Sequence, residues 1–438
     1  MQDEKSHGLF GRPDEVPGGA RTARHLKDEK SGELFERLAK VMPGANTRTV
    51  THYDPFPVAI DHGEGCRIWD VDGNSYIDLI NNYTALIHGH AHPRIVEAMT
   101  RTAAQGLAAA VPAPIALQGE LAERLCSRTP SIDLVRFSNS ATEAVMMAVR
   151  AARAFTGRDE VIMPANGYHG SWDQVSLSGT DEAHPDGAEG VVPPGIPKVL
   201  AGIVHFVRFN DIGHLEELMR QHGSSTAAIL LEPILGHILE PGDPEFIRAA
   251  LRLAHEYGAL LILDETITCR LYVGGWQAQH GIEADLTTMG KTIAGGMPVG
   301  AFGGKEHVMR IFDPRIPDPL SAHGTMNGSP LCLAAGCASL DMLDQPAIDR
   351  LNGLGESLAE QLDVAGRDAG TDVRVHNCGS LLQVNCADPL AFHRACLEEG
   401  LYIAPRGSMN MSTPMDDAVI EEIVAAWKRA IDRVDWSN

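Results

Sequence analysis

Two strand-like runs of this sequence each lead into a residue that could do covalent or ionic chemistry. The apolar run 260–263 is followed directly by Asp264. The run 286–289 is followed, after one glycine, by Lys291. Open α/β sheets bind their ligands at the carboxyl ends of their strands. We therefore expect one carboxylate and one lysine at the same edge of a sheet.

These two residue types suggest a particular chemistry. A lysine amine can form a Schiff base, and burial makes it more nucleophilic because burial lowers its pKa. An aspartate can pair with a protonated pyridine nitrogen. Together the two groups are what a protein supplies to pyridoxal 5'-phosphate (PLP). Taken singly, Lys291 could also be a surface lysine and Asp264 a residue of a turn.

Two further segments could bind parts of such a ligand. The segment 138–144, Ser-Asn-Ser-Ala-Thr-Glu-Ala, lies between a predicted strand and a predicted helix. Backbone N–H groups at a helix start bind phosphate, although an ordinary capping box is the alternative. In the segment 167–170, two glycines flank Tyr168 and His169. Glycine allows close approach of the backbone to a ligand, and an aromatic ring can stack on a flat one.

Composition narrows the classes of partner. The chain has 438 residues and a formal net charge of −22. Such a charge repels polyanions, so we expect no nucleic acid and no membrane as partners. The eight cysteines form no CxxC pair, residues 1–30 do not resemble a signal peptide, and the apolar runs are too short to span a membrane. We expect a cytoplasmic protein. The alternating His88, His90 and His92 lack further ligands at suitable spacing, so no metal is expected.

Strand and helix patterns alternate from about residue 134 to 289. This rhythm predicts an α/β fold with a mainly parallel sheet covered on both faces. Residues 1–27 carry no apolar periodicity and are expected to form a flexible N-terminal arm. Beyond about residue 345 the pattern changes to an α+β rhythm, which indicates a second, smaller domain at 346–438.

The motifs, taken together, resemble the class III (fold type I) PLP-dependent aminotransferases from about residue 33 to the end. Within that class the resemblance is strongest to the branch of glutamate-1-semialdehyde aminomutase and the β-amino acid aminotransferases. It implies a large PLP-binding domain at 81–345 and an N-terminal helix and hairpin at 28–80 that pack with the small domain. The matching motifs are GHAHP (89–93), SNSATEA (138–144), GYHG (167–170), EP (232–233), LDE (263–265), the T-x-x-G-K-x-x-x-G-G stretch (287–296) and HGTMNGSP (323–330).

The resemblance also implies roles for single residues. Lys291 would form the Schiff base and move the proton, and Asp264 would pair with the ring nitrogen. Tyr168 would stack on the ring. The remaining cofactor contacts would come from Ser140, Ala141 and Thr142 at the phosphate, from His169 and Glu232 near the ring, and from Thr325 of a neighbouring subunit in a homodimer with composite sites.

Two positions depart from the pattern of the family. The family usually has glycine where Ala141 stands, and the added methyl group is harmless only if φ is negative there. The family often has valine after the Asp-Glu pair, where this chain has Thr266.

Two arginines bear on the substrate. The segments around Arg48 and Arg406 resemble those of the (S)-β-phenylalanine aminotransferases, in which arginines at these places bind substrate carboxylates. Guanidinium groups bind carboxylates through paired, charge-assisted hydrogen bonds. Surface salt bridges are the alternative. Arg270, between the two strand ends, could be structural or could lie near the pocket.

The resemblance leads us to expect a ping-pong aminotransferase that moves an amino group from a β-amino acid, with aromatic ones among the candidates, to a 2-oxo acid such as 2-oxoglutarate or pyruvate. An aminomutase of the glutamate-1-semialdehyde type, or an amino acid racemase, is the alternative on the same scaffold. A PLP-binding protein without catalysis is a third possibility. A nicotinamide-dependent dehydrogenase fits poorly, because no GxGxxG motif follows an early strand.

Overall fold

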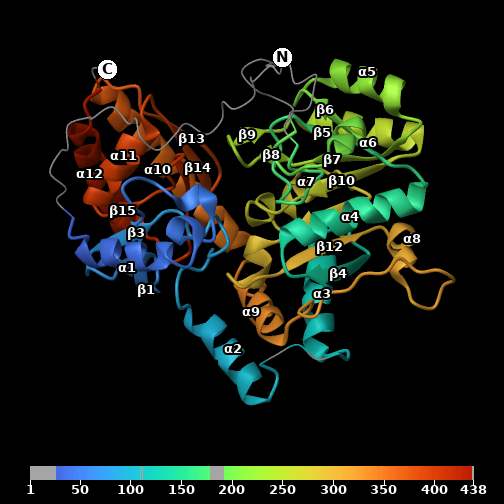
Figure 1. Cartoon of the computed structure of the whole chain (residues 1–438), viewed down its shortest axis with the longest axis horizontal. Helices are drawn as coiled ribbons and strands as arrows, with labels where there is room; N and C mark the ends of the chain where they lie inside the picture. Colours follow the sequence, from blue (N-terminus) through green and yellow to red (C-terminus); the bar gives the residue numbers. More distant parts are fainter. Residues whose placement is uncertain (1–25, 109, 111, 178–191, 437–438) are drawn as a thin grey trace, which may run out of the picture.

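The computed structural model describes residues 26–108, 110, 112–177 and 192–436 (Figure 1). Its α-helices are α1 (Glu29–Ala39), α2 (Pro93–Ala104), α3 (Ala116–Arg128), α4 (Ala141–Thr156), α5 (Ile212–His222), α6 (Pro244–Tyr257), α7 (Gly275–Gln279), α8 (Glu306–Met309), α9 (Pro330–Leu340), α10 (Gln345–Asp368), α11 (Pro389–Glu398) and α12 (Asp417–Arg433). Its strands are β1 (Ile60–Glu64), β2 (Arg67–Asp70), β3 (Ser75–Asp78), β4 (Leu134–Ser138), β5 (Glu160–Pro164), β6 (Val204–Val207), β7 (Thr226–Leu231), β8 (Ile234–Leu235), β9 (Glu240–Pro241), β10 (Leu260–Asp264), β11 (Leu286–Met289), β12 (Gly300–Gly304), β13 (Arg374–Cys378), β14 (Leu381–Asn385), β15 (Leu401–Tyr402) and β16 (Ser408–Asn410).

A seven-stranded sheet forms the centre of the larger part of the molecule. Its strand order is β4-β12-β11-β10-β7-β5-β6. The strands β11, β10, β7, β5 and β6 pair in parallel, and β12 is antiparallel to both β11 and β4. The expected α/β fold with a mainly parallel sheet is therefore confirmed. Its strands end where the expected chemistry begins, because Asp264 is the last residue of β10.

Alternate side chains of the parallel strands pack into two separate cores. In β10, Leu260 and Ile262 face the core that contains α4 and α8. Leu261 and Leu263 face the core on the other side, which contains α5 and α6. A strand buried on both faces reads as a continuous apolar run, and the run 260–263 does so. The expectation of helices on both faces of the sheet is confirmed.

Strand β12 was not predicted, because its sequence Gly-Ala-Phe-Gly-Gly has little strand propensity. Close contact between backbones explains its glycines. A Cβ on Gly300 would lie 2.0 Å from the carbonyl oxygen of Ser140, and one on Gly304 would lie 2.1 Å from that of Asp285. The sheet accepts this strand because it lacks side chains at these points.

The first and last parts of the chain lie side by side in the smaller part of the molecule, blue and red in Figure 1. The predicted hairpin is confirmed as β2 and β3, which pair antiparallel. Strand β15 pairs in parallel with β3, so one sheet combines both ends of the chain. Ile77 and Leu79 share a core with α10 and α12. The expected domain limits at residues 27, 80 and 345 remain a prediction.

The first helix of the described residues, α1, ends at Ala39, and a short 3-10 turn, Pro43–Ala45, follows. The N-terminal arm expected at 1–27, except residues 26 and 27, lies outside the described residues.

The close packing of β12 leads to a prediction about stability. We expect Gly304→Ala to destabilise the protein by about 1–3 kcal/mol, because the new methyl group must displace the backbone near Asp285. Gly119→Ala is the matched control, since nothing lies within 4 Å of a Cβ at that helical position. Urea denaturation of both variants measures the difference. Equal stability of the two variants would contradict the packing described.

Candidate active site

Lys291 follows β11 directly after Gly290 and begins the short 3-10 helix Lys291–Ala294. Its φ is +51°, a left-handed conformation that is uncommon for a residue with a side chain. Such conformations concentrate at functional sites, where the surrounding structure enforces them. Burial lowers the pKa of the Lys291 amine, and the negative charges of Glu232 and Asp264 partly oppose this effect. The charges of two carboxylates thus act on the amine, which is still more easily deprotonated than that of a surface lysine.

Asp264 is 3% exposed and accepts three hydrogen bonds. Nδ1 of His169 lies 3.0 Å from its Oδ2, and the backbone N–H and hydroxyl of Thr266 donate to its Oδ1 at 3.2 and 2.5 Å. Burial alone would raise the pKa of Asp264, but these hydrogen bonds and the charge of His169 outweigh it and lower the pKa. Asp264 is therefore an ionised carboxylate in a buried position.

His169 completes this pair. It is 1% exposed, and its pKa is raised, because the hydrogen bond and the charge of Asp264 outweigh the opposing effect of burial. Its second ring nitrogen, Nε2, is buried and has no hydrogen-bond partner. A buried polar atom without a partner is uncommon and points to a group that completes the site.

Glu232 holds the neighbouring segment in place. Its side chain is buried, and its two carboxylate oxygens accept the backbone N–H groups of Tyr168 (2.7 Å) and Gly236 (3.1 Å). Burial raises the pKa of Glu232 to about 7, against the lowering effect of His169. Tyr168 itself is 57% exposed, so its ring is open to contact with a ligand.

The expected phosphate cradle lies at the start of α4. Ser140 caps this helix, and its hydroxyl accepts the backbone N–H of Glu143 at 3.2 Å. Ala141 is the first helical residue and has a negative φ, so its methyl group causes no backbone strain. The capping box expected as the alternative is present in part. The carboxylate of Glu143 accepts the backbone N–H of Asn139, whereas a full capping box would have it accept the N–H of Ser140.

Two glycines bring the other segments against this helix start. A Cβ on Gly290 would lie 2.9 Å from the methyl group of Ala141. A Cβ on Gly170 would lie 2.4 Å from the hydroxyl oxygen of Thr142. The structure therefore brings the segment of Lys291, the segment of His169 and the helix start into direct contact.

The two arginines lie on the surface, and both act on one tyrosine. Nη1 of Arg48 donates to Oδ1 of Asn82 (2.6 Å), and Nη1 of Arg406 lies 3.4 Å from Nε2 of His237. Burial raises the pKa of Tyr83, and the positive charges of both arginines act against this rise. The charges of Arg48 and Arg406, which are far apart in sequence, thus both act on Tyr83.

The segment that carries Tyr83 was not singled out in the sequence. Its four residues, 81–84, all have positive φ values between 45° and 78°. The segment contacts the lysine loop, because the hydroxyl of Thr292 donates to the carbonyl of Thr84 at 3.3 Å. The pair Asn81-Asn82 was the available signal, since asparagine adopts left-handed conformations more readily than most residues.

Arg270 is fully buried, and its guanidinium donates to Oγ of Ser380 (3.1 Å), to Oδ1 of Asn410 (3.0 Å) and to the carbonyl of Met411. These contacts join the segment after β10 to the residue before β14 and to the end of β16. The charge of Arg270 also contributes to lowering the pKa of Lys291, so this arginine both makes structural contacts and acts on the site. Burial lowers the pKa of Arg270 to about 10.

Thr325 lies in an exposed turn of the chain. Two residues further on, Oδ1 of Asn327 accepts a hydrogen bond from the side-chain nitrogen of Asn139 at 2.8 Å. This turn therefore contacts the segment before the helix start. The hydrogen bond between Asn139 and Asn327, like the segment 81–84, was not predicted from the sequence.

These residues fit PLP. Asp264 supplies the ionised carboxylate that a pyridinium nitrogen needs, and Lys291 supplies an amine of lowered pKa. The start of the 16-residue helix α4, with the hydroxyls of Ser140 and Thr142, supplies N–H groups and a dipole suited to a phosphate. The unpartnered Nε2 of His169 is an additional polar atom at this site.

The fold and the site define a PLP-dependent enzyme of fold type I. The family model of class III aminotransferases matches residues 49–431, so the chain belongs to that family, whose cofactor is PLP. The chain is 37% identical to a glutamate-1-semialdehyde 2,1-aminomutase of Pelotomaculum thermopropionicum, over 86% of this chain and 91% of that one. It is also 37% identical to a β-phenylalanine transaminase of Variovorax paradoxus, over 90% of this chain and 91% of that one.

Among solved structures, an ω-transaminase from Sphaerobacter thermophilus is 38% identical and superimposes with a TM-score of 0.87, over 92% of this chain and 97% of that one. The expected resemblance is confirmed. The described helices include none that is both long and apolar enough to cross a membrane.

The raised pKa of Glu232 leads to a prediction about pH. A carboxyl group that binds its proton more tightly in the folded state stabilises that state at low pH, and this contribution is lost as the pH rises from about 4.5 to about 7. We expect Glu232→Gln to remove this dependence. Between pH 4.5 and pH 8 the free energy of unfolding of the variant should therefore rise by up to about 3 kcal/mol relative to that of the wild type.

Urea denaturation of the cofactor-free proteins at the two pH values measures the change. Glu360→Gln, at an exposed position of α10, is the control. The same stability difference between wild type and Glu232→Gln at both pH values would contradict the assignment.

Proposed function

We propose that this enzyme transfers an amino group from a β-amino acid to a 2-oxo acid in a ping-pong reaction. The observation that carries the proposal is that two exposed arginines from different segments, Arg48 and Arg406, both act through their charges on Tyr83. A transaminase binds two substrates in turn, and a β-amino acid and a 2-oxo acid hold their carboxylates at different distances from the reacting carbon. Two separate guanidinium groups offer each carboxylate a partner. The β-phenylalanine transaminase of Variovorax paradoxus supports the choice of donor.

In this proposal each residue of the site has a task. PLP, when bound, supplies a pyridinium ring that accepts electron density from the bond broken at the amine-bearing carbon. Asp264 would keep the ring nitrogen protonated, while His169 and Thr266 orient its carboxylate. Nζ of Lys291 would hold the cofactor and would take the proton from the β carbon of the donor.

The rest of the site positions the cofactor and its ring. Ser140, Ala141 and Thr142 would hold the phosphate at the start of α4. Tyr168 would stack on the ring, on a segment that Glu232 fixes through its backbone hydrogen bond. The first half-reaction consumes the β-amino acid and water, releases a β-keto acid and leaves the amino group on the enzyme. In the second, the 2-oxo acid accepts the amino group and water is released.

We also propose a homodimer in which Thr325 of each subunit reaches the cofactor phosphate of the other. Support comes from the exposure of Thr325 in a single chain.

Substitution of the arginines tests the choice of substrate. We expect Arg48→Ala and Arg406→Ala to raise KM for β-amino acids at least about tenfold, because each removes a charge-assisted pair with a carboxylate. The measurement is steady-state kinetics with a panel of α-, β- and ω-amino acids, each with 2-oxoglutarate and with pyruvate. Arg315→Ala is the matched control, since Arg315 is exposed and pairs with Asp313. Lys291→Ala provides the inactive reference.

A simple amine without a carboxylate separates the contribution of the arginines from general damage. The arginine variants should retain their activity on such an amine. Equal wild-type activity on amines with and without a carboxylate would contradict the proposed donor class.

An aminomutase is the second candidate, because the relative from Pelotomaculum thermopropionicum is as similar as the transaminase. The need for an acceptor separates the two. We expect turnover of a β-amino acid to stop after one equivalent per active site when no 2-oxo acid is present. Rapid-quench analysis of product against enzyme measures this. Continued turnover without an acceptor would favour a mutase or a racemase.

A further inference from the structure

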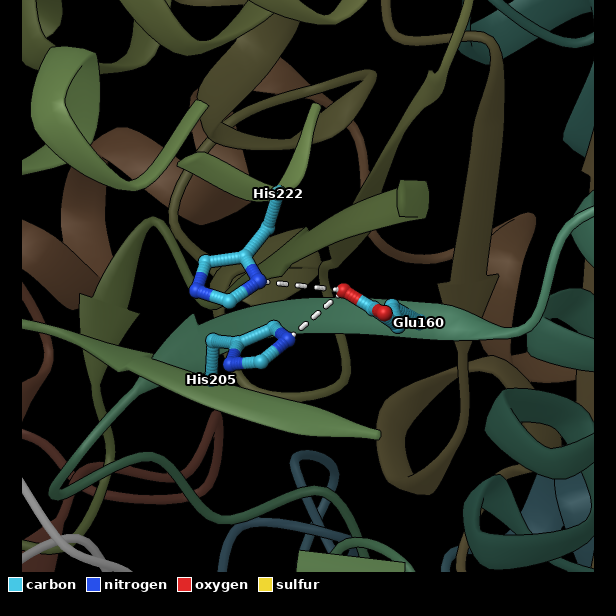
Figure 2. Close-up of side chains that lie close together, drawn as sticks. All are labelled: Glu160, His205 and His222. Carbon is cyan, nitrogen blue, oxygen red and sulfur yellow. Dashed lines mark hydrogen bonds and ion pairs between the residues drawn. The ribbon is translucent and has the colours of Figure 1, made fainter. Parts of the chain in front are cut away.

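A cluster of two histidines and one glutamate lies away from the site described above (Figure 2). Oε2 of Glu160 is 2.7 Å from Nε2 of His205 and 3.4 Å from Nδ1 of His222. All three ligand atoms lie within 4.8 Å of one another. Figure 2 shows both imidazole rings turned toward the same carboxylate oxygen.

Three different elements hold these side chains. Glu160 begins β5, His205 lies in β6, and His222 ends α5. The backbone N–H of Glu160 donates to the carbonyl of Ser225 (3.1 Å), and the N–H of Ser225 donates to the carbonyl of His222 (2.9 Å). These bonds fix the end of α5 against the start of β5. The backbone positions of Glu160 and His222 are therefore fixed relative to each other.

The cluster lies at the opposite end of the sheet from the cofactor site. Glu160 is the first residue of β5, whereas Asp264 is the last residue of β10, and both strands run parallel to β7. A ligand bound at Glu160 therefore does not touch the cofactor residues. The cluster needs an explanation of its own.

We propose that Glu160, His205 and His222 form a zinc site. Two imidazole nitrogens and one carboxylate oxygen are a donor set that Zn²⁺ takes in proteins, with the fourth position left to water. Ligand atoms around a tetrahedral Zn²⁺ are separated by about 3.3 Å. The separation of His222 and Glu160 already matches this value, and that of His205 and Glu160 requires an opening of about 0.6 Å.

The surroundings favour metal binding over a cluster of charged histidines. The two imidazole rings are stacked, with centroids 3.7 Å apart, so protonation of both would bring two like charges together. Burial lowers the pKa of His205, although its hydrogen bond to Glu160 opposes this, and a neutral imidazole is the form that binds metal. The side chains are 17–32% exposed, so an ion can enter from solvent.

Zinc titration of the PLP-loaded enzyme tests the proposal. We expect isothermal titration calorimetry to detect one Zn²⁺ per chain, and zinc to raise the apparent melting temperature of the wild type. His222→Ala and Glu160→Gln should each weaken binding at least about tenfold, a loss that even outer-shell partners of a metal can cause. His255→Ala is the matched control. His255 pairs with Asp285 at 2.9 Å, but this pair lacks the second histidine of the proposed site, so the variant should bind zinc as the wild type does.

Two further measurements keep the result interpretable. Circular dichroism and unchanged transamination by His222→Ala establish that the variant is folded, since this residue lies outside the cofactor site. Cobalt(II) replaces zinc in a second titration, because the chain also has eight cysteines that could bind zinc. Cobalt(II) bound by histidine nitrogens and a carboxylate oxygen shows visible absorption bands but no charge-transfer band from a thiolate. A thiolate band, no binding, or equal zinc affinity of wild type and His222→Ala would overturn the proposal.

Discussion

The site depends on one buried charge, the carboxylate of Asp264. Strand β10 is buried on both faces, so this carboxylate ends the strand in a place that water hardly reaches. An unpaired buried charge would cost several kcal/mol or would become neutral. His169 and Thr266 prevent this, because their hydrogen bonds favour the ionised form. The carboxylate also opposes the loss of charge on Lys291, so the aspartate and the lysine of the site form one electrostatic unit.

Other contacts keep this unit in position. Glu232 fixes the backbone beside His169, and close glycine contacts hold the lysine loop and the His169 segment against α4. Arg270 joins the segment after β10 to the smaller part of the molecule, with neutral acceptors rather than carboxylates around its charge. A movement of the two parts relative to each other would therefore act on the segment that follows Asp264.

Local patterns were sufficient for the parallel strands and for the convergence of Asp264 and Lys291, because apolar runs and strand ends can be read directly from a sequence. Strand β12 was missed, since its glycines make sense only beside the backbones of Ser140 and Asp285. The partners of Arg270 lie 110 to 141 residues away, so these contacts were not visible either. The joint electrostatic effect of Arg48 and Arg406 on Tyr83, and the Glu160 cluster, likewise result from tertiary packing. The chemical roles of the site residues remain predictions.

The central claim is that ionised Asp264 keeps the ring nitrogen of the cofactor protonated. The most direct measurement is the ¹⁵N chemical shift of PLP labelled at that nitrogen and bound to the wild type and to Asp264→Asn. We predict a protonated nitrogen in the wild type from pH 6 to pH 9, because a buried carboxylate stabilises the pyridinium charge across this range. The asparagine variant should show an unprotonated nitrogen. An unprotonated nitrogen in the wild type, or identical shifts in both proteins, would contradict the account.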